Sequence, residues 1–305
     1  MIKDIVFFNH FHNGDVFHSR GFVQFLMDYF PNTNFWYHHL WGPKLLQDMR
    51  CGYRQVLPIS DQLHKHTQLL ESVDSIFINT WVGAWFDDKD AILPYKGETN
   101  FRFNYYMYEK IYEVLSQWIG KKIDYPTPSE VSKLFPVIDY SKFPACENMN
   151  IDKSKKNVLF SNGPVHSGQC NYTGNLSEII EFVADAYPAI DFYATHKYNS
   201  NKKNVIFTSD IIKAERPDLN EISYISTFCN LVIGRNSGPF CFTTTKDNVL
   251  TEGKKFFSFG KREQDSFYLG IDDAKCRFYF HYYERPEALY QIINDLVKEE
   301  NERSS

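Results

Sequence analysis

The sequence lacks the features that mark secreted, zinc-binding and membrane-spanning proteins. Only six of its 305 residues are cysteines, and they are scattered without a close pair or a CxxC motif. Such spacing favours a reducing compartment and argues against a disulfide framework or a structural zinc site. No apolar run approaches the roughly 20 residues that span a bilayer, and the first ten residues do not form a signal-peptide pattern. We therefore expect a cytoplasmic protein, with peripheral contact to a membrane surface as an open alternative.

An excess of positive charge is also missing. The chain has 33 Lys and Arg against 38 Asp and Glu, which gives a formal net charge of -5. A nucleic-acid partner usually requires a basic surface, so we expect none. Hydrophobic residues make up 43% of the chain, as in ordinary soluble proteins. The length suits two domains of roughly 150 residues better than one core.

Strand-like and helix-like segments alternate in both halves of the chain. In the first half, strands are predicted at 3–9, 35–39 and 75–79, and helices at 16–30 and 100–120. The proline-rich and polar segment 121–156 marks a boundary. In the second half, strands are predicted at 156–162, 190–196, 204–210, 229–234 and 254–260, the last of them, and helices at 176–188, 222–228 and 287–300.

This alternation predicts an α/β fold with two Rossmann-like doubly wound domains that face a cleft. The predicted domains are residues 1–140 and 150–305. Packing of the last helix back onto the first domain is an open alternative.

The connection between the first strand and the first helix concentrates polar groups: His10, His12, Asn13, Gly14 and Asp15. Open α/β sheets bind ligands at the carboxyl ends of their strands, which is where this connection should lie. Asn13-Gly14 predicts a tight turn with positive φ. Asp15 then falls at or near the helix N-cap. It could be a plain helix cap, or a carboxylate that takes a proton from an attacking hydroxyl. Its spacing alone leaves both uses open.

Two loops of the second half could bind an anion. Loop 161–175 contains glycines and small residues that suit close approach to a phosphate, but it matches no Walker A or GxGxxG motif, so a plain flexible loop is equally open. Loop 233–240 follows a buried strand. There Asn236, Ser237 and Gly238 could present backbone N–H groups at a helix start, and Arg235 adds a phosphate donor. We favour an anion site in this second loop.

These turns, in this order and at this separation, resemble those of GT-B-type glycosyltransferases. The likeness in layout is closest to the ADP-heptose:lipopolysaccharide heptosyltransferase family. Gly14-Asp15 matches that family's Gly-Asp turn, and Ser237-Gly238 matches its Asp-Ser/Thr-Gly turn, followed by a strand ending in Phe-Gly. Asn236 stands where the family has an acid, and Cys241 where a histidine is common. ADP-heptose itself is therefore not implied as the donor.

The resemblance implies a hexosyl- or heptosyltransferase of polysaccharide biosynthesis. It would move a sugar from a nucleotide diphosphate sugar to a glycan or glycolipid hydroxyl, with Asp15 as the general base. Acceptor-binding residues would be His10, His12, Asn13, Trp81 and Trp85. Nucleotide-sugar-binding residues would be Gly14, Ser161, Asn162, Gly163, His166, His196, Arg235, Asn236, Ser237 and Gly238. We expect no metal and no other cofactor, because a helix dipole and Arg235 can stabilise the leaving diphosphate.

Alternatives to this function remain open. The chain could be a nucleotide-sugar epimerase of the same fold, or a non-catalytic carbohydrate-binding relative, which Asn236 and Cys241 would favour. Trp81 and Trp85 could pack between domains instead of stacking on an acceptor sugar.

A metal site is a further alternative. His10 and His12 with His18 could supply ligands, although such histidines are often only hydrogen-bonding. The acidic run 85–90 is similar to the Asp-x-Asp motif of the other glycosyltransferase fold, and a solvated loop is the competing interpretation.

Overall fold

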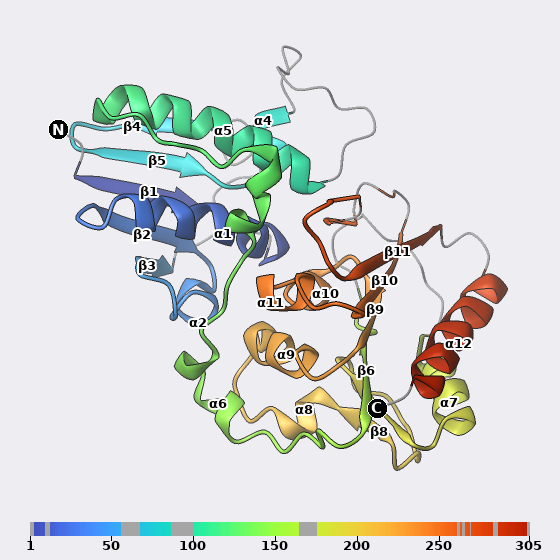
Figure 1. The fold of residues 1–305 in the computed structure, drawn as a ribbon. Helices are drawn as coiled ribbons and strands as arrows, with labels where there is room; N and C mark the ends of the chain where they lie inside the picture. The colour runs from blue at the N-terminus through green and yellow to red at the C-terminus, as the bar shows by residue number, and fades with distance from the viewer. Residues whose placement is uncertain are drawn as a thin grey trace. The chain divides into compact units, whose positions relative to one another are not determined.

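The structure is a computed structural model of the chain, and its elements form two compact units, Met1–Ile138 and Asp139–Ser305 (Figure 1). Each unit has its own β-sheet with helices, which confirms the predicted α/β class. The structure describes residues 3–9, 13–55, 68–86, 100–164, 176–260, 263, 266–268, 270–282 and 286–303.

The sheet of the first unit has the strand order β3-β2-β1-β5-β4. Its strands are β1 (Asp4–Phe8), β2 (Asn34–His39), β3 (Gly52–Gln55), β4 (Leu69–Glu71) and β5 (Ser75–Asn79). All pairs are parallel except β4 with β5, which is antiparallel. The sequence analysis missed β3 and β4, because strands this short show no recognisable alternation of apolar and polar residues.

Two long helices, α1 (Asn13–Tyr29) and α5 (Asn100–Ile119), pack against each other in the first unit. The rings of Phe22 and Tyr108 stack with centroids 4.5 Å apart, and those of Phe25 and Tyr112 with centroids 6.1 Å apart. Tyr112 also donates a hydrogen bond to the carbonyl of Phe22. The shorter helices are α2 (Gly42–Leu45), α4 (Gly83–Phe86) and the 3-10 helix η1 (Pro128–Leu134).

The sheet of the second unit has the strand order β11-β10-β9-β6-β7-β8, and every pair is parallel. Its strands are β6 (Lys156–Ser161), β7 (Ile190–Ala194), β8 (Val205–Phe207), β9 (Leu231–Arg235), β10 (Lys255–Gly260) and β11 (Arg277–Tyr282). Numbered along the chain, this is the 3-2-1-4-5-6 order of the Rossmann fold. The prediction that the segment 254–260 is the last strand was wrong. β11 is a half-exposed edge strand of mixed aromatic and charged residues, so its sequence shows no buried-strand pattern.

The core of the second unit joins strands of this sheet to α7 (Leu176–Ala186) and α12 (Pro286–Glu302). The last helix contributes the fully buried Leu289 and Ile293 to that core. The remaining helices are η2 (Tyr140–Lys142), α6 (Pro144–Glu147), α8 (Thr208–Ile211), α9 (Leu219–Ser226), α10 (Gly238–Cys241) and α11 (Lys246–Val249). Among the described helices of both units, none is long and apolar enough to cross a membrane.

The chain is held tightly on both sides of the boundary between the units. In the first unit, Val137 accepts hydrogen bonds at its carbonyl from Arg20 Nε (2.7 Å) and Gln24 Nε2 (2.9 Å), and its N–H donates to Gln24 Oε1 (3.1 Å). In the second unit, the Tyr140 hydroxyl lies 2.9 Å from Ser223 Oγ of α9. Val137 is thus fixed to α1, and Tyr140 to α9.

Candidate functional site

Each sheet has a switch point, where two neighbouring strands are continued along the chain toward opposite edges of the sheet. In the first unit it lies between β1 and β5, and in the second between β6 and β9. Ligands of open α/β sheets bind outside the carboxyl ends of the strands at such points. The described candidate residues end or follow these four strands, except for His196, which follows β7.

Asp15 lies in the first turn of α1, as its third residue. Asn13 and Gly14 are the first two residues of the helix. The predicted tight turn with positive φ is therefore wrong, since the positive-φ residues in the described ranges are glycines elsewhere in the chain. The helix begins earlier than the sequence suggested, and Asp15 lies among the free N–H groups of its first turn instead of preceding them. His10 and His12 lie outside the described residues.

A buried chain of hydroxyls lies behind Asp15. Ser19 follows Asp15 by one helical turn, on the same face of α1. Its Oγ donates to the carbonyl of Val16 (2.8 Å) and lies 2.8 Å from the Tyr37 hydroxyl, which lies 2.7 Å from Thr80 Oγ1. Each hydroxyl can both donate and accept a hydrogen bond, so the three side chains form one connected network. The chain of hydroxyls therefore fixes the first turns of α1 to β2 and to the end of β5.

Asp15 also acts electrostatically on this hydroxyl chain. Burial raises the pKa of Tyr37 far above its usual value, and the charge of Asp15 raises it further. Tyr37 is therefore a neutral hydrogen-bond donor over the whole working pH range. The same two causes raise the pKa of Tyr108, whose ring packs on α1.

Trp81 and Trp85 are held at the carboxyl end of β5 by one asparagine. Asn79 Oδ1 accepts a hydrogen bond from the Trp81 N–H (2.9 Å), and the Asn79 carbonyl accepts one from Trp85 Nε1 (2.8 Å). Gly83 lies directly against the Trp81 indole, since a Cβ at Gly83 would come within 2.4 Å of it. Asn79 was not predicted as a site residue. In the sequence it is the polar residue that ends the apolar run SIFIN, and in the structure it is fully buried.

Asn162 joins the segments that follow β6 and β7. Its Nδ2 donates to the carbonyl of His196 (2.9 Å), and its Oδ1 accepts from the His196 N–H (2.8 Å). Both polar atoms of the Asn162 side chain are thus hydrogen-bonded to the backbone of His196, and these bonds hold together the segments that follow β6 and β7. The His196 side chain is exposed at this edge, and His166 lies outside the described residues.

The ends of β6 and β9 come close together. Ser161 pairs with Gly234, where a Cβ would lie 2.6 Å from that of Ser161, so only glycine fits. Arg235, which is buried, donates through Nη1 to the carbonyl of Gly163 (2.9 Å). Ser237 precedes α10 without capping it through its side chain, and its Oγ lies 3.5 Å from Ser161 Oγ. A guanidinium and two hydroxyls therefore gather at the switch point of the second sheet.

Asn236 stands in the middle of this group. Its side chain is only 7% exposed, and its Nδ2 has no hydrogen-bond partner among the described residues. A buried donor without an acceptor costs about 1–3 kcal/mol, so an oxygen-rich ligand would relieve that cost. Asn236 thus places a neutral hydrogen-bond donor where an anion could bind.

The proposed metal ligands are only partly visible. Within the described ranges, no cluster of three or more His, Cys, Asp or Glu side chains could hold a metal ion. His18 is buried in α1, and burial lowers its pKa to about 3. The acidic run 85–90 is described only for its first two residues, which belong to α4.

Comparison with known proteins adds to this geometry. No protein-family model matches the chain, and no curated protein sequence does. A glycosyl transferase family 9 structure from Veillonella parvula DSM 2008 matches 96% of this chain and 91% of its own, with a TM-score of 0.53 and 16% identity. The E. coli heptosyltransferase WaaC with ADP matches 97% of this chain and 99% of its own, with a TM-score of 0.54 and 10% identity. The chain thus has a GT-B glycosyltransferase fold similar to that of heptosyltransferases, as the sequence predicted.

Proposed function

We propose that the protein is a glycosyltransferase that moves a sugar from a nucleotide diphosphate sugar to a hydroxyl of a glycan or glycolipid. One observation carries the proposal: in both sheets, polar groups gather at the switch point, which is where this class of fold binds ligands. The matching WaaC structures hold ADP or ADP-2-deoxy-2-fluoro heptose, and a donor of that general kind would suit the polar groups of the second unit.

The second unit would bind the donor. Arg235, Ser237 and Gly238 would contact the diphosphate, and the Asn236 amide would donate to one of its oxygens. Glycine at position 163 leaves room beside Arg235, with Ser161, Asn162, His166 and His196 around the nucleotide. Arg235 and backbone N–H groups would offset the charge of the leaving diphosphate, so the reaction needs no metal.

The first unit would bind the acceptor. Asp15 would accept the proton of the acceptor hydroxyl while that oxygen attacks the anomeric carbon and the nucleoside diphosphate leaves. The hydroxyl chain of Ser19, Tyr37 and Thr80 supports this role, because it fixes the helical turn that carries Asp15. Trp81 and Trp85 would offer aromatic surfaces to the acceptor sugar, with His10, His12, Asn13 and Gly14 beside them.

Incubation of the full chain with ADP-, UDP- and GDP-sugars and a mixed glycan acceptor tests the proposal. We expect one donor to release free nucleotide in step with the appearance of glycosylated acceptor. Interconversion of the sugar with the nucleotide still attached would identify an epimerase. Saturable binding of sugars without turnover of any donor would identify a non-catalytic carbohydrate-binding relative.

A further inference from the structure

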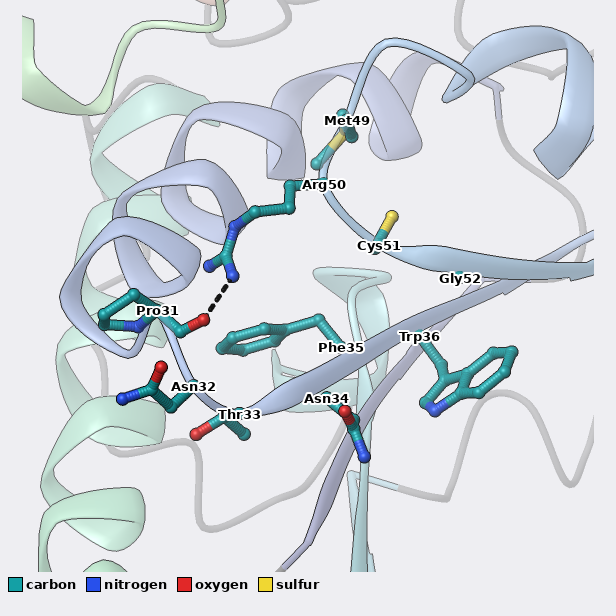
Figure 2. Close-up of a pocket in the computed structure, with 10 residues that line it drawn as sticks. All are labelled: Pro31, Asn32, Thr33, Asn34, Phe35, Trp36, Met49, Arg50, Cys51 and Gly52. Carbon is teal, nitrogen blue, oxygen red and sulfur yellow. Dashed lines mark hydrogen bonds between the residues drawn. The ribbon is translucent and has the colours of Figure 1, made fainter.

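The first unit has a hollow at the edge of its sheet opposite the candidate site. The cavity is about 510 Å³ and is lined by residues 31–36, which lead into β2, and residues 49–52, which lead into β3 (Figure 2). Because β2 and β3 run parallel to β1, this is the edge where their amino ends lie. The volume is within the range of small-molecule sites.

Trp36 forms a fixed wall of this cavity. Its indole lies over the backbone of Gly52, its partner in β3, where a Cβ would come within 2.5 Å of the ring. Its Nε1 donates to Asp4 Oδ1 at 3.2 Å. The residue is nevertheless 40% exposed. The indole is thus covered on one side by a strand, held by a hydrogen bond, and open to solvent elsewhere.

Short polar side chains line the pocket along the chain that leads to the indole. Asn32, Thr33 and Asn34 line the cavity along the chain that leads into Trp36, and both asparagines are exposed (Figure 2). Amide groups both donate and accept hydrogen bonds, as sugar hydroxyls do. This part of the wall carries no charge.

Among the described residues that line the pocket, the one cation, Arg50, is already engaged. Arg50 donates through Nη1 to the carbonyl of Pro31 (2.7 Å) and through Nη2 to the carbonyl of Met27. Its guanidinium also lies 5.9 Å from the centre of the Phe35 ring. These contacts tie the cavity wall to the end of α1 and make Arg50 a poor anchor for a phosphate or carboxylate. The chemistry of the cavity therefore favours a neutral ligand.

We propose that this cavity binds a neutral sugar unit of a glycan chain. One C–H face of the sugar would lie on the Trp36 indole, and its hydroxyls would bond to Asn32 and Asn34. The strand rise of about 3.3 Å per residue separates this cavity from the carboxyl edge of the sheet by roughly 15 Å. The cavity would thus hold a sugar far from the transferred one on a long acceptor. That last role rests on the proposed function, whereas sugar binding by itself does not.

Direct titration tests the proposal. The full chain is titrated by calorimetry and tryptophan fluorescence with three neutral probes, cellohexaose, maltohexaose and chitohexaose. We expect at least one probe to bind, and Trp36→Ala to weaken it at least tenfold while Trp36→Phe keeps part of the affinity. Trp41→Ala is the matched control, because Trp41 belongs to the same unit and is 37% exposed, and it should change nothing.

Three results would overturn the proposal. The first is that none of the three oligosaccharides binds the wild-type chain, and the second is that Trp36→Ala leaves their affinity intact. Competition by inorganic phosphate or adenosine would also reject a neutral sugar site in favour of a nucleotide or anion site. Because binding is measured without a donor, a chain that binds the oligosaccharide yet releases no nucleotide would refute the transferase function and leave this site standing.

Discussion

The Tyr37 hydroxyl and Ser19 Oγ are hydrogen-bonded across 2.8 Å, one helical turn beyond Asp15. The two residues come from β2 and α1, and Thr80 after β5 completes the chain of hydroxyls. All three side chains are buried. The position of the first turn of α1 is therefore set by hydrogen bonds to two strands of the sheet, in addition to apolar packing.

Removal of this central hydroxyl should destabilise the first unit modestly. In Tyr37→Phe, Ser19 keeps its bond to Val16, and Thr80 keeps the Phe8 carbonyl 3.3 Å away, so neither is left without a partner. We expect a loss of about 1 kcal/mol in the free energy of unfolding, measured by denaturant titration. The control is Tyr29→Phe, which removes an exposed hydroxyl at the end of α1 and should cost less stability. Equal stability of the two variants would contradict the role given to the hydroxyl chain.

Asp15→Asn should separate a general base from a structural carboxylate. Asn keeps the size of Asp and its hydrogen-bonding oxygen but cannot accept the proton, so turnover should fall by roughly 10²–10⁴ while nucleotide affinity stays unchanged. Initial rates with the donor found in the panel give the measurement. Asp28→Asn changes an exposed carboxylate in the last turns of the same helix and should keep full turnover. If Asp15→Asn transfers sugar at the wild-type rate, Asp15 is not the base.

Gly238→Leu should weaken nucleotide binding. The added side chain would occupy space at the start of α10, beside Ser237 and the end of β6. We expect at least a tenfold loss of affinity for the best-bound of ADP, UDP and GDP, measured by calorimetry, with acceptor binding intact. Gly42→Ala in the first unit, whose Cβ would make an ordinary 3.5 Å contact with Tyr53, is the control. Unchanged nucleotide affinity in Gly238→Leu would place the nucleotide elsewhere.

Burial of His18 should make the protein less stable in mild acid. Its pKa is lowered to about 3 in the folded chain, against 6.5 when exposed. Below pH 6.5 the unfolded chain takes up a proton that the folded chain does not, so stability falls as the pH falls towards 3. Between pH 7 and pH 5 the wild type should lose about 2 kcal/mol more than His18→Gln, in denaturant titrations at each pH. Parallel slopes for wild type and His18→Gln would refute the prediction.

Much of the fold could be predicted because its main elements are long or fully buried. α1, α5 and α12 show helical spacing of apolar residues, and β1 and β6 contain the apolar runs IVFF and VLF. The three missed strands lack such signals. β3 and β4 are too short, and β11 is half exposed at the edge of its sheet.

The candidate site could be predicted in part. Ser161, Arg235 and Ser237 stand directly after apolar runs, and the carboxyl ends of parallel strands share one edge, so their proximity follows from the strand order. The Tyr37–Thr80 contact could not be predicted in the same way. It depends on β1 lying between β2 and β5 and on their register, which no local pattern encodes.

The hydrogen bonds to Val137 and Tyr140 have a mechanical consequence. Each of these residues is an attachment point, one on α1 and the other on α9, and only Ile138 and Asp139 lie between them. Each residue has two soft backbone torsions, φ and ψ, so Ile138 and Asp139 together supply four such torsions between the two attachment points. A substitution at Ile138 or Asp139 therefore acts on the segment between a residue bonded to α1, the helix that carries Asp15, and a residue bonded to α9.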